Sequence, residues 1–347
     1  MYLMKDANGS IIYVGKAKNL KNRVRTYFQN SIAHSQKINK LKANIKDFEY
    51  LLTDTEFEAF ILECKLIKEL KPFYNKRMKS PLAYTYLVIH MDDHPRKIEI
   101  TNHPKEKDGN LYFGPYTSKH TVEKAIFGIK EAYKILCSNP SKKSTACLNH
   151  SLGLCIGMCL GGAALNQYNQ IIDKIIELLT GRDTSILEEM EQRMIAYADK
   201  FDYEAASKYR DSIDSINFLL NKEKIIEFTE ENKNIVVIES LPDSTWKLFL
   251  IKGKTILFSQ IFKMDEKPME QLSKNICLHF NIAEPSRLNE VGRDEIDEAQ
   301  IIYSYLKNSQ IHYLEILENW LQAGGEISLN KELNKFLSTA SKSPWLH

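Results

Sequence analysis

Short apolar runs alternate with turn residues over the first fifty positions of the chain. The runs at 2–4 and 11–14 are rich in strand-forming residues, and the segment DANGS at 6–10 has the chemistry of a tight turn, which predicts a β-hairpin. A basic stretch at 19–28 has helical character, and 45–53 (IKDFEYLLT) has the pattern of a third strand. The chain therefore opens with a small mixed α/β unit.

A second helix is predicted from Thr55 to about Leu70. Thr55 and Glu58 have the spacing of a capping box, and Pro72 closes the helix. At ~100° per residue the apolar side chains share one arc, formed by Phe57, Phe60, Ile61, Cys64 and Ile67. Glu63 falls on this apolar side, where a carboxylate needs a buried base, a set of amides or a metal ion. A salt bridge to one of the many lysines is the alternative.

Later segments show strand and helix patterns in separate blocks, which predicts an α+β multidomain protein. Strand-like runs occur at 84–89 and 97–101, helical periodicity at 186–220, and three further strand-like runs between 235 and 262. The expected units are an N-terminal α/β domain at 1–78, a linking α/β segment at 79–136, a cysteine cluster at 137–160, a helical region at 161–222 containing a hairpin at 186–220, a small α/β unit at 223–292 and a helical tail at 293–347.

Length and composition agree with several units. At ~100 to 200 residues per domain, 347 residues suit two to four. Hydrophobic residues at 43% and charged residues at 27% are typical of a soluble globular protein and exclude a fibrous, disordered or membrane-spanning one. The first ten residues carry Lys5 and Asp6 with no apolar segment behind them, and no apolar run approaches ~18 residues. We expect a cytoplasmic protein with no membrane partner.

Positive charge is concentrated near the N-terminus. Residues 1–80 hold 16 Lys and Arg against 8 Asp and Glu, although the whole chain has a net charge of only +2. Between Lys16 and Lys46 there are nine basic residues and no acidic one. Such a stretch predicts a surface for a phosphate backbone, and a solvated helical face is the alternative. The candidate DNA-binding residues are Lys18, Lys21, Arg25, Lys37 and Lys40.

Four of the six cysteines lie within 23 residues, at Cys137, Cys147, Cys155 and Cys159, with glycines between them. Without secretory features this clustering favours a metal centre over disulfides. Four thiolates suit zinc or a cubane iron-sulfur cluster, and free thiols stay a third alternative. His150 is expected not to be a ligand, because four thiolates complete the set. Cys64 and Cys277 stand alone and are expected to be core thiols.

The first 75 residues resemble the GIY-YIG nuclease domain of the UvrC family, the incision subunit of bacterial nucleotide excision repair. The residues that carry the resemblance are Tyr2, YVGKAKNL at 13–20, RVR at 23–25, YF at 27–28, TDTE at 53–56, LE at 62–63, LIK at 66–68 and PFYN at 72–75. The short homologue (Cho), which lacks the C-terminal RNase-H-like nuclease, is the most similar form expected.

The resemblance implies a hydrolytic phosphodiesterase site. Glu63 corresponds to the single ligand of one Mg or Mn ion, and Tyr13 to the general base that deprotonates water for in-line attack. Tyr2 helps to orient the site. Lys16 and Arg23 correspond to cations that lower the pKa of the tyrosine from ~10 and stabilise developing negative charge. The remaining two, Tyr27 and Asn75, correspond to positions that support these groups or touch the substrate.

One departure from the family concerns the beginning of the chain. It starts at Met1 and Tyr2, without the glycine of the family's first half-motif. Because the first residues of a domain fray unless they are tied down, Tyr2 is expected to be loosely held.

Three later segments extend the resemblance. YFGPY at 112–116 matches a family motif, whereas the linker at 78–83 departs from it. The cysteine spacing is similar to the UvrC cluster and implies a four-iron, four-sulfur site, with zinc as the alternative. The pattern at 201–211 resembles the UVR motif, through which UvrC and UvrB associate, and a plain helical hairpin packed on its own domain is the alternative. The implied partner-binding residues are Phe201, Tyr203, Glu204, Ala205 and Arg210.

Together these resemblances imply a metal-dependent DNA endonuclease that makes a single 3′-side incision in damaged duplex DNA loaded by UvrA and UvrB. Two other functions stay open. One is a non-cleaving repair factor that kept binding to DNA and UvrB, and the other is a structure-selective nuclease that acts without UvrB.

Overall fold

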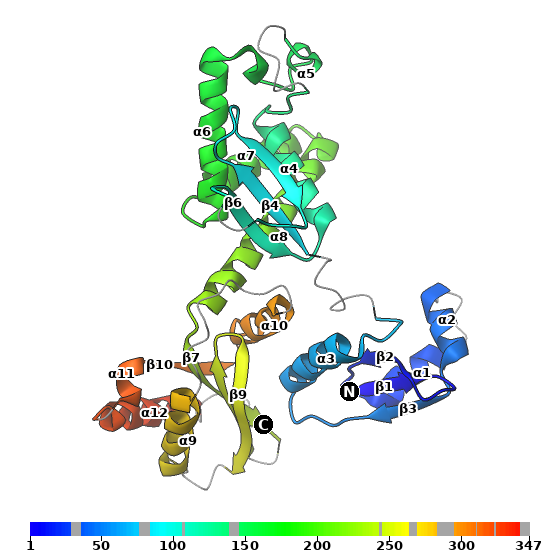
Figure 1. Cartoon of the computed structure of the whole chain (residues 1–347), viewed down its shortest axis with the longest axis vertical. Coiled ribbons are helices and arrows are strands. Elements are labelled where there is room, and N and C mark those ends of the chain that lie inside the picture. The colour runs from blue at the N-terminus through cyan, green and yellow to red at the C-terminus, as the bar shows by residue number, and fades with distance from the viewer. Residues whose placement is uncertain are drawn as a thin grey trace. The chain divides into compact units, whose positions relative to one another are not determined.

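The computed structural model describes residues 1–28, 36–75, 84–105, 108–138, 146–242, 245–263, 269–282, 295–309, 311–322 and 324–340. These residues form two compact units (Figure 1). The first unit combines residues 1–81 with 227–347, and the second comprises residues 82–226. The linker at 78–83 lies outside the described residues.

The N-terminal part of the first unit is a three-stranded antiparallel sheet with helices. Its strands have the order β2-β1-β3, so that β1 is the central strand. The elements are β1 (Tyr2–Lys5), β2 (Ile11–Gly15), α1 (Leu20–Phe28), α2 (Gln36–Asn44), β3 (Asp47–Tyr50) and α3 (Glu56–Leu70). The predicted capping box is confirmed, because Glu58 N–H donates to Thr55 Oγ1 and the Glu58 carboxylate accepts from the Thr55 N–H.

The C-terminal part of the first unit is a four-stranded antiparallel sheet of order β10-β7-β8-β9. Its elements are β7 (Asn234–Leu241), β8 (Thr245–Lys252), β9 (Thr255–Lys263), α9 (Met269–Ile282), α10 (Ile296–Leu306), β10 (His312–Ile316), α11 (Glu318–Leu321) and α12 (Glu326–Ala340). Both faces of the sheet are covered: α9 and α12 share one core with it, and α3 and α10 share another.

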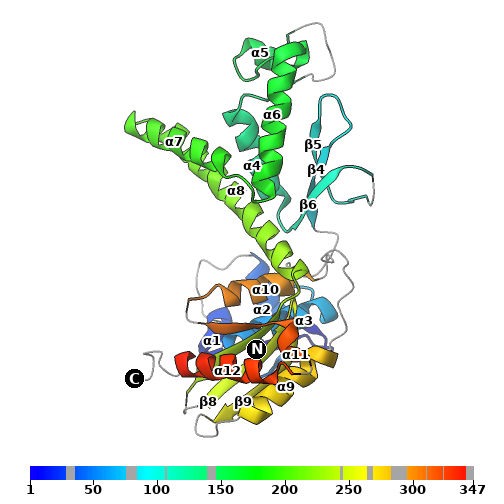
Figure 2. The same ribbon diagram turned by 90° about the vertical axis from the view of Figure 1, so that its left-hand side faces the viewer.

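The second unit contains a smaller sheet of order β5-β4-β6 packed with helices around one large core. Its elements are β4 (Thr85–His90), β5 (Lys97–Thr101), β6 (Leu111–Tyr116), α4 (Lys119–Ala132), α5 (Leu148–Ser151), a 3-10 turn η2 (Met158–Leu160), α6 (Gly162–Leu179), α7 (Ser185–Asp199) and α8 (Tyr203–Glu230). A short turn joins α7 to α8, and the two form the predicted helical hairpin (Figure 2).

Three elements differ from the sequence-based predictions. Helix α2 was not predicted, because only Leu41 is buried along it and the other apolar positions are too few to show a helical period. Strand β3 is shorter than 45–53, and all four of its side chains are exposed. The segment 293–347 is not purely helical, since β10 joins the sheet beside β7. Over the described ranges, no helix combines the length and hydropathy needed to cross a bilayer.

Candidate active site

Three tyrosines from separate elements meet above the small sheet. The ring centroids of Tyr2, Tyr13 and Tyr27 lie 6.1 to 6.3 Å from one another. The hydroxyls of Tyr2 and Tyr27 share a hydrogen bond of 2.9 Å. Strands β1 and β2 and helix α1 therefore place three of the predicted site residues in one cluster.

Gly15 provides the space that Tyr2 occupies. The two residues are opposite each other in the β1–β2 register, and a Cβ atom built on Gly15 would lie 2.5 Å from Tyr2 Oη. No real Cβ approaches a heavy atom so closely, so any larger residue at position 15 must displace the ring. The YVG motif therefore requires glycine at its third position because a side chain there would clash with Tyr2.

Tyr2 is firmly held, which corrects the expectation of a loose terminus. Its side chain is 1% exposed, and its strand is hydrogen-bonded on both sides, to β2 and to β3. The terminal ammonium of Met1 donates to the carbonyl oxygen of Leu51 at 2.9 Å. Fraying requires exposed, unpaired backbone, and the central position of β1 removes both conditions.

The two predicted cations act on different groups. Arg23 Nε lies 3.4 Å from Tyr2 Oη, and its guanidinium is 5.5 Å from the centre of the Tyr27 ring. Lys16 Nζ lies 3.2 Å from the centre of the Phe60 ring and 3.4 Å from Glu56. Only Arg23 therefore touches the tyrosine cluster.

Glu63 projects from α3 toward this cluster and is half-buried. Burial raises the pKa of its carboxyl, while the charge and backbone N–H of Lys16, the N-terminal ammonium and Arg23 oppose the increase. Among the described residues, Glu63 forms no ion pair with a lysine or arginine within 4 Å, so the salt-bridge alternative is not supported. A desolvated carboxylate with positive potential but no direct counter-ion is a suitable ligand for a small divalent cation.

Burial also raises the pKa of the tyrosines, contrary to the expected lowering. The pKa of Tyr27 rises to about 12 and that of Tyr13 rises further, in each case mainly through desolvation. Arg23 lowers both values but does not overcome this effect. The expectation was wrong because a sequence motif does not show how deeply a tyrosine is buried, and burial disfavours the charged phenolate.

Asn75 supports the site from behind. Its Oδ1 accepts from the Val14 N–H and its Nδ2 donates to the Val14 carbonyl, both at 2.9 Å. The residue is 8% exposed, and both ends of its amide are used. Asn75 therefore clamps the free edge of β2, next to Tyr13.

The basic surface lies mainly on α1 and on its approach. Lys21, Arg25 and Lys40 are exposed, and Lys37 on α2 is partly buried. Lys18 is exposed and pairs with Glu56 at 3.0 Å. Helix α1, which carries Arg23 and Tyr27, therefore also carries the exposed cations Lys21 and Arg25.

Comparison with protein families matches three consecutive segments. Residues 1–76 match the UvrC-like GIY-YIG domain, residues 84–178 the middle domain of the UvrC/Cho excinuclease, and residues 184–217 the UvrB/uvrC motif. In these segments the chain is a UvrC-family protein.

The relatives of the chain carry the same name. It is 35% identical over 321 residues to the UvrABC system protein C of Acetivibrio thermocellus, which covers 89% of this chain and 51% of the relative. It is 39% identical over 287 residues to the UvrABC system protein C of Caldicellulosiruptor saccharolyticus, and this match covers 78% of this chain and 46% of the relative. The chain therefore spans about half the length of the curated relatives it matches.

The cysteine segment lies within residues 84–178, which match the UvrC/Cho middle domain. The sulfurs of Cys137, Cys147 and Cys155 lie within 4.8 Å of one another, and Cys159 is buried and hydrogen-bonds to Cys147. Burial raises the pKa of Cys147, but backbone N–H groups of Ser138 and His150 outweigh it and lower the value to about 6. These are the conditions that a thiolate-ligated centre needs.

His150 makes a contact with the backbone of the same segment. Its Nδ1 lies 2.9 Å from the carbonyl oxygen of Cys155, which orients the imidazole by a backbone contact. The other two cysteines are confirmed as separate: Cys64 is buried in α3, and Cys277 is partly buried beside the core of the larger sheet.

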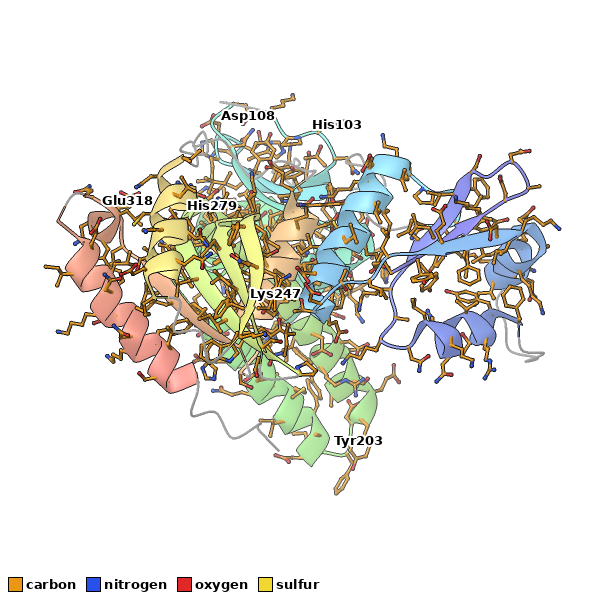
Figure 3. All side chains as sticks on the ribbon, turned by 90° about the horizontal axis from the view of Figure 1, so that it is seen from below. His103, Asp108, Tyr203, Lys247, His279 and Glu318 are labelled. Atoms are coloured by element: carbon orange, nitrogen blue, oxygen red, sulfur yellow. The ribbon has the colours of Figure 1, made fainter. Side chains whose placement is uncertain are left out.

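In the UVR hairpin the middle of α8 is buried, whereas the turn between α7 and α8 is exposed. On α8, Ile213, Ile216 and Leu219 pack into the core of their own unit. At the tip Phe201 and Tyr203 are 77% and 64% exposed, and Figure 3 shows Tyr203 projecting outward. Packing on its own domain thus accounts for the middle of α8 and not for the aromatic tip.

The other predicted partner-binding residues surround this tip. Glu204 is exposed and pairs with Lys208 at 2.9 Å, and Arg210 is exposed and bonds to Asp211. Ala205 is partly buried, and its N–H is capped by Asp202 Oδ1 at 3.1 Å. Side chains for a partner are therefore available at the start of α8.

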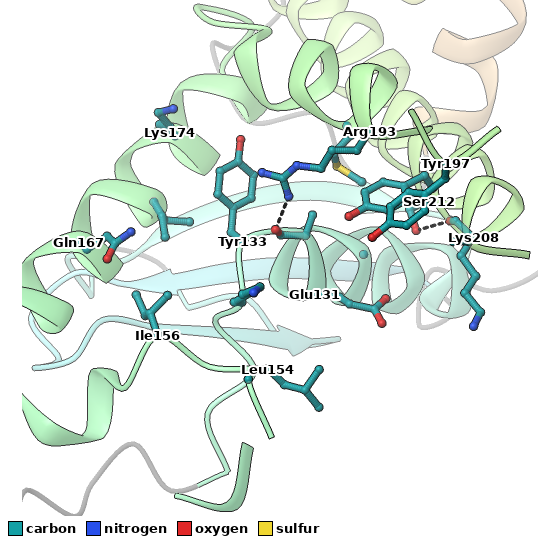
Figure 4. Close-up of a pocket in the computed structure, with 18 of the residues that line it drawn as sticks. Glu131, Tyr133, Leu154, Ile156, Gln167, Lys174, Arg193, Tyr197, Lys208 and Ser212 are labelled. Atoms are coloured by element: carbon teal, nitrogen blue, oxygen red, sulfur yellow. Dashed lines mark hydrogen bonds between the residues drawn. The ribbon is translucent and has the colours of Figure 1, made fainter. Parts of the chain in front are cut away.

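A groove of about 790 Å³ beside the hairpin was not predicted (Figure 4). It is lined by α4, the cysteine segment, α6, α7 and α8. Glu189 joins three of the side chains around it, since it accepts from Tyr133 and Lys174 and pairs with Arg193. Arg193 also donates to the carbonyl of Ala132, as Figure 4 shows. The groove connects the UVR hairpin to the cysteine segment.

Proposed function

We propose that this protein is a metal-dependent DNA endonuclease of nucleotide excision repair, which makes a single 3′-side incision in damaged duplex DNA loaded by UvrA and UvrB. The observation that carries the proposal is the convergence of Glu63 with Tyr13, Tyr2, Tyr27 and Arg23 beside a basic surface. A phosphodiester placed there would meet a metal-ligand carboxylate, a base and a cation.

Each residue has a role in the hydrolysis. As a phenolate, Tyr13 would take a proton from the water whose oxygen forms the new bond to phosphorus, while the ester P–O bond breaks and the leaving oxygen departs with the bonding electron pair. Because burial raises its pKa, Tyr13 needs nearby positive charge to act as a base, and Arg23 supplies part of that charge. Bound at Glu63, one Mg or Mn ion would polarise the phosphate and stabilise the leaving oxygen.

The decisive experiment is nicking of a site-specifically damaged duplex with UvrA, UvrB, ATP and Mg. We expect one cut on the 3′ side of the lesion, lost by at least a hundredfold (~10²) in Glu63→Gln because the metal ligand is removed. Glu69→Gln is the matched control, since Glu69 is an exposed carboxylate on the same helix. Cutting that survives Glu63→Gln would refute the proposed site.

The same assay separates the two alternatives. The missing glycine of the first half-motif motivated the non-cleaving factor, although Tyr2 itself is buried. Binding to the UvrB–DNA complex without any cut would still favour it. Cutting of flapped or branched DNA above background, with UvrB omitted, would favour the structure-selective nuclease.

We further propose that Cys137, Cys147, Cys155 and Cys159 hold a four-iron, four-sulfur cluster. The close sulfurs and the lowered pKa of Cys147 support a thiolate-bound centre, and zinc is the alternative. The cluster would serve a structural or redox role, since no catalytic residue lies in this segment.

Metal analysis of the anaerobically purified chain tests this centre. We expect about four iron and four sulfide per chain, and loss of both in Cys147→Ser, because that thiol contacts two of the others. Cys277→Ser is the control, as Cys277 lies outside the cluster. Stoichiometric zinc without sulfide would replace the iron-sulfur assignment by a zinc site.

A further inference from the structure

Helix α3, which carries Glu63, is buried on two sides. On one side Ile67 packs with Leu3 and Val14 of the small sheet. On the other, Phe57 and Ile61 belong to a core formed with β7, β8 and α10. The helix of the proposed metal ligand is therefore shared between the GIY-YIG domain and the C-terminal sheet, a segment that no matched family model covers.

Aromatic contacts fix the face of α3 that is turned to this sheet. The Phe57 ring stacks on Tyr305 of α10, with centroids 3.9 Å apart and planes inclined by 5°. It also meets Phe249 of β8 edge-on at 5.2 Å. Tyr305 in turn donates a hydrogen bond of 2.7 Å to Glu239 of β7. These contacts hold the first turn of α3 against the sheet.

Lys247 adds two ion pairs to the same contact. It alternates with Phe249 on the face of β8 turned toward α3, and the residue is 5% exposed (labelled in Figure 3). Its Nζ lies 2.6 Å from Asp54 and 2.7 Å from Glu58. Burial lowers the pKa of Lys247, but the two carboxylates outweigh this and raise it, so the ammonium is charged.

The carboxylates that Lys247 binds belong to the cap of α3. Glu58 accepts hydrogen bonds from the N–H groups of Asp54 and Thr55, at 3.1 and 3.3 Å, through the oxygen that is not closest to Lys247. Lys247 thus connects β8 directly to the capping box. Removing the ammonium would leave the partly buried carboxylate of Glu58, and the more exposed one of Asp54, without their shared cation, and the cost falls mainly on Glu58.

We propose that Lys247 is a positioning residue for Glu63, and that the C-terminal sheet is thereby a working part of the nuclease. Glu63 follows Glu58 by five residues, or ~7.5 Å along the helix, so a tilt at the cap displaces the metal ligand. A displacement of ~1 Å in such a ligand costs up to ~10²-fold in rate. The role in cutting rests on the proposed nuclease function, whereas the role in holding α3 does not.

The test compares Lys247→Met and Lys247→Arg in the full chain with wild type. We expect Lys247→Met to lower the nicking rate by about tenfold to a hundredfold and to raise the Mg concentration for half-maximal rate, because Glu63 is misplaced. Lys247→Arg should largely restore both the nicking rate and the half-maximal Mg concentration, since a guanidinium also binds two carboxylates. Lys263→Met on the neighbouring strand β9 is the matched control, as Lys263 is exposed.

Two readouts do not depend on cutting. Amide hydrogen exchange at residues 55–70 should accelerate in Lys247→Met, while exchange in β4–β6 stays unchanged. Mn binding, followed by electron paramagnetic resonance, should weaken. If wild type itself makes no cut, the proposed nuclease fails, and exchange at α3 still decides the role of Lys247.

Asp54→Asn provides a second variant should Lys247→Met not fold. Alone it should raise the half-maximal Mg concentration modestly, because Glu58 still binds Lys247. Combined with Lys247→Met it should recover part of the loss, since it removes one uncompensated carboxylate. The proposal is overturned if Lys247→Met keeps the wild-type Mg dependence and the wild-type amide exchange of α3. It is also overturned if Lys263→Met changes these two quantities as much as Lys247→Met does, or if Asp54→Asn has the wild-type half-maximal Mg concentration.

Discussion

At the scale of single residues, the site depends on close pairs. Tyr2 and Gly15 belong to different strands, and the ring of one occupies the space left by the absent side chain of the other. Asn75 replaces a neighbouring strand for Val14, by bonding both of its backbone groups. Neither role follows from the residue type alone, because each depends on which residue lies opposite.

Gly15→Ala should abolish the site by crowding Tyr2. The new Cβ would lie 2.5 Å from Tyr2 Oη, so the ring must move away from Tyr27 and Arg23. We expect nicking to fall by more than tenfold and the free energy of unfolding to fall by about 1–3 kcal/mol, as for other overpacked cores. Urea unfolding and the nicking assay measure the two effects.

Gly9→Ala is the control for that substitution. Gly9 lies in the β1–β2 turn at a φ of +79° with no atom within 4 Å of a built Cβ, so alanine there introduces backbone strain without a clash. We expect a stability loss of about 1 kcal/mol with normal cutting by the folded protein. Equal activity losses in both variants would mean that crowding of Tyr2 is not the cause.

At the scale of elements, two helices each combine a part that packs in a core with a part that carries residues of a proposed site. Helix α8 inserts Ile213 and Ile216 into its own core and presents Tyr203 at its exposed start. Helix α3 directs Glu63 to the tyrosines and Phe57 to a second sheet. A single apolar arc was predicted for α3, but Phe60 on that arc is 37% exposed beneath Lys16.

The exposed tip of the hairpin should be needed for the proposed association with UvrB. Replacing both Phe201 and Tyr203 by alanine is expected to weaken UvrB binding by at least tenfold, because exposed aromatic side chains are frequent hot spots of interfaces. The melting temperature should change little, since neither side chain is buried. Calorimetric titration with UvrB and thermal unfolding measure the two quantities.

Ile195→Ala is the matched control for the tip, as Ile195 is an apolar side chain on α7 that is 55% exposed. Wild-type affinity in the double variant of Phe201 and Tyr203 would assign UvrB docking to another surface.

At the scale of the whole molecule, segments distant in sequence combine into one unit. Residues 1–81 and 227–347 form a single compact unit, which the predicted series of consecutive domains did not include. The contacts that join them include a stacked aromatic pair, an apolar core, the ion pairs of Lys247 and the ion pair of Lys68 with Glu298. The paired residues lie about 190 to 250 positions apart in the sequence, and no local pattern encodes such a pairing.

The sequence by itself determined the family resemblance, the hairpin and capped helix of the nuclease domain, the four clustered cysteines and the helical hairpin. These features are local: periodicity, turn chemistry and motif spacing act within a few residues of one another.

Tertiary structure alone decided which cation touches the tyrosines, that burial raises their pKa and that Asn75 clamps β2. It also decided that β10 joins the four-stranded sheet and that α3 packs against it. Desolvation and long-range pairing depend on the residues that surround a side chain in space. Those residues come from segments distant in the sequence, so the local pattern does not predict them.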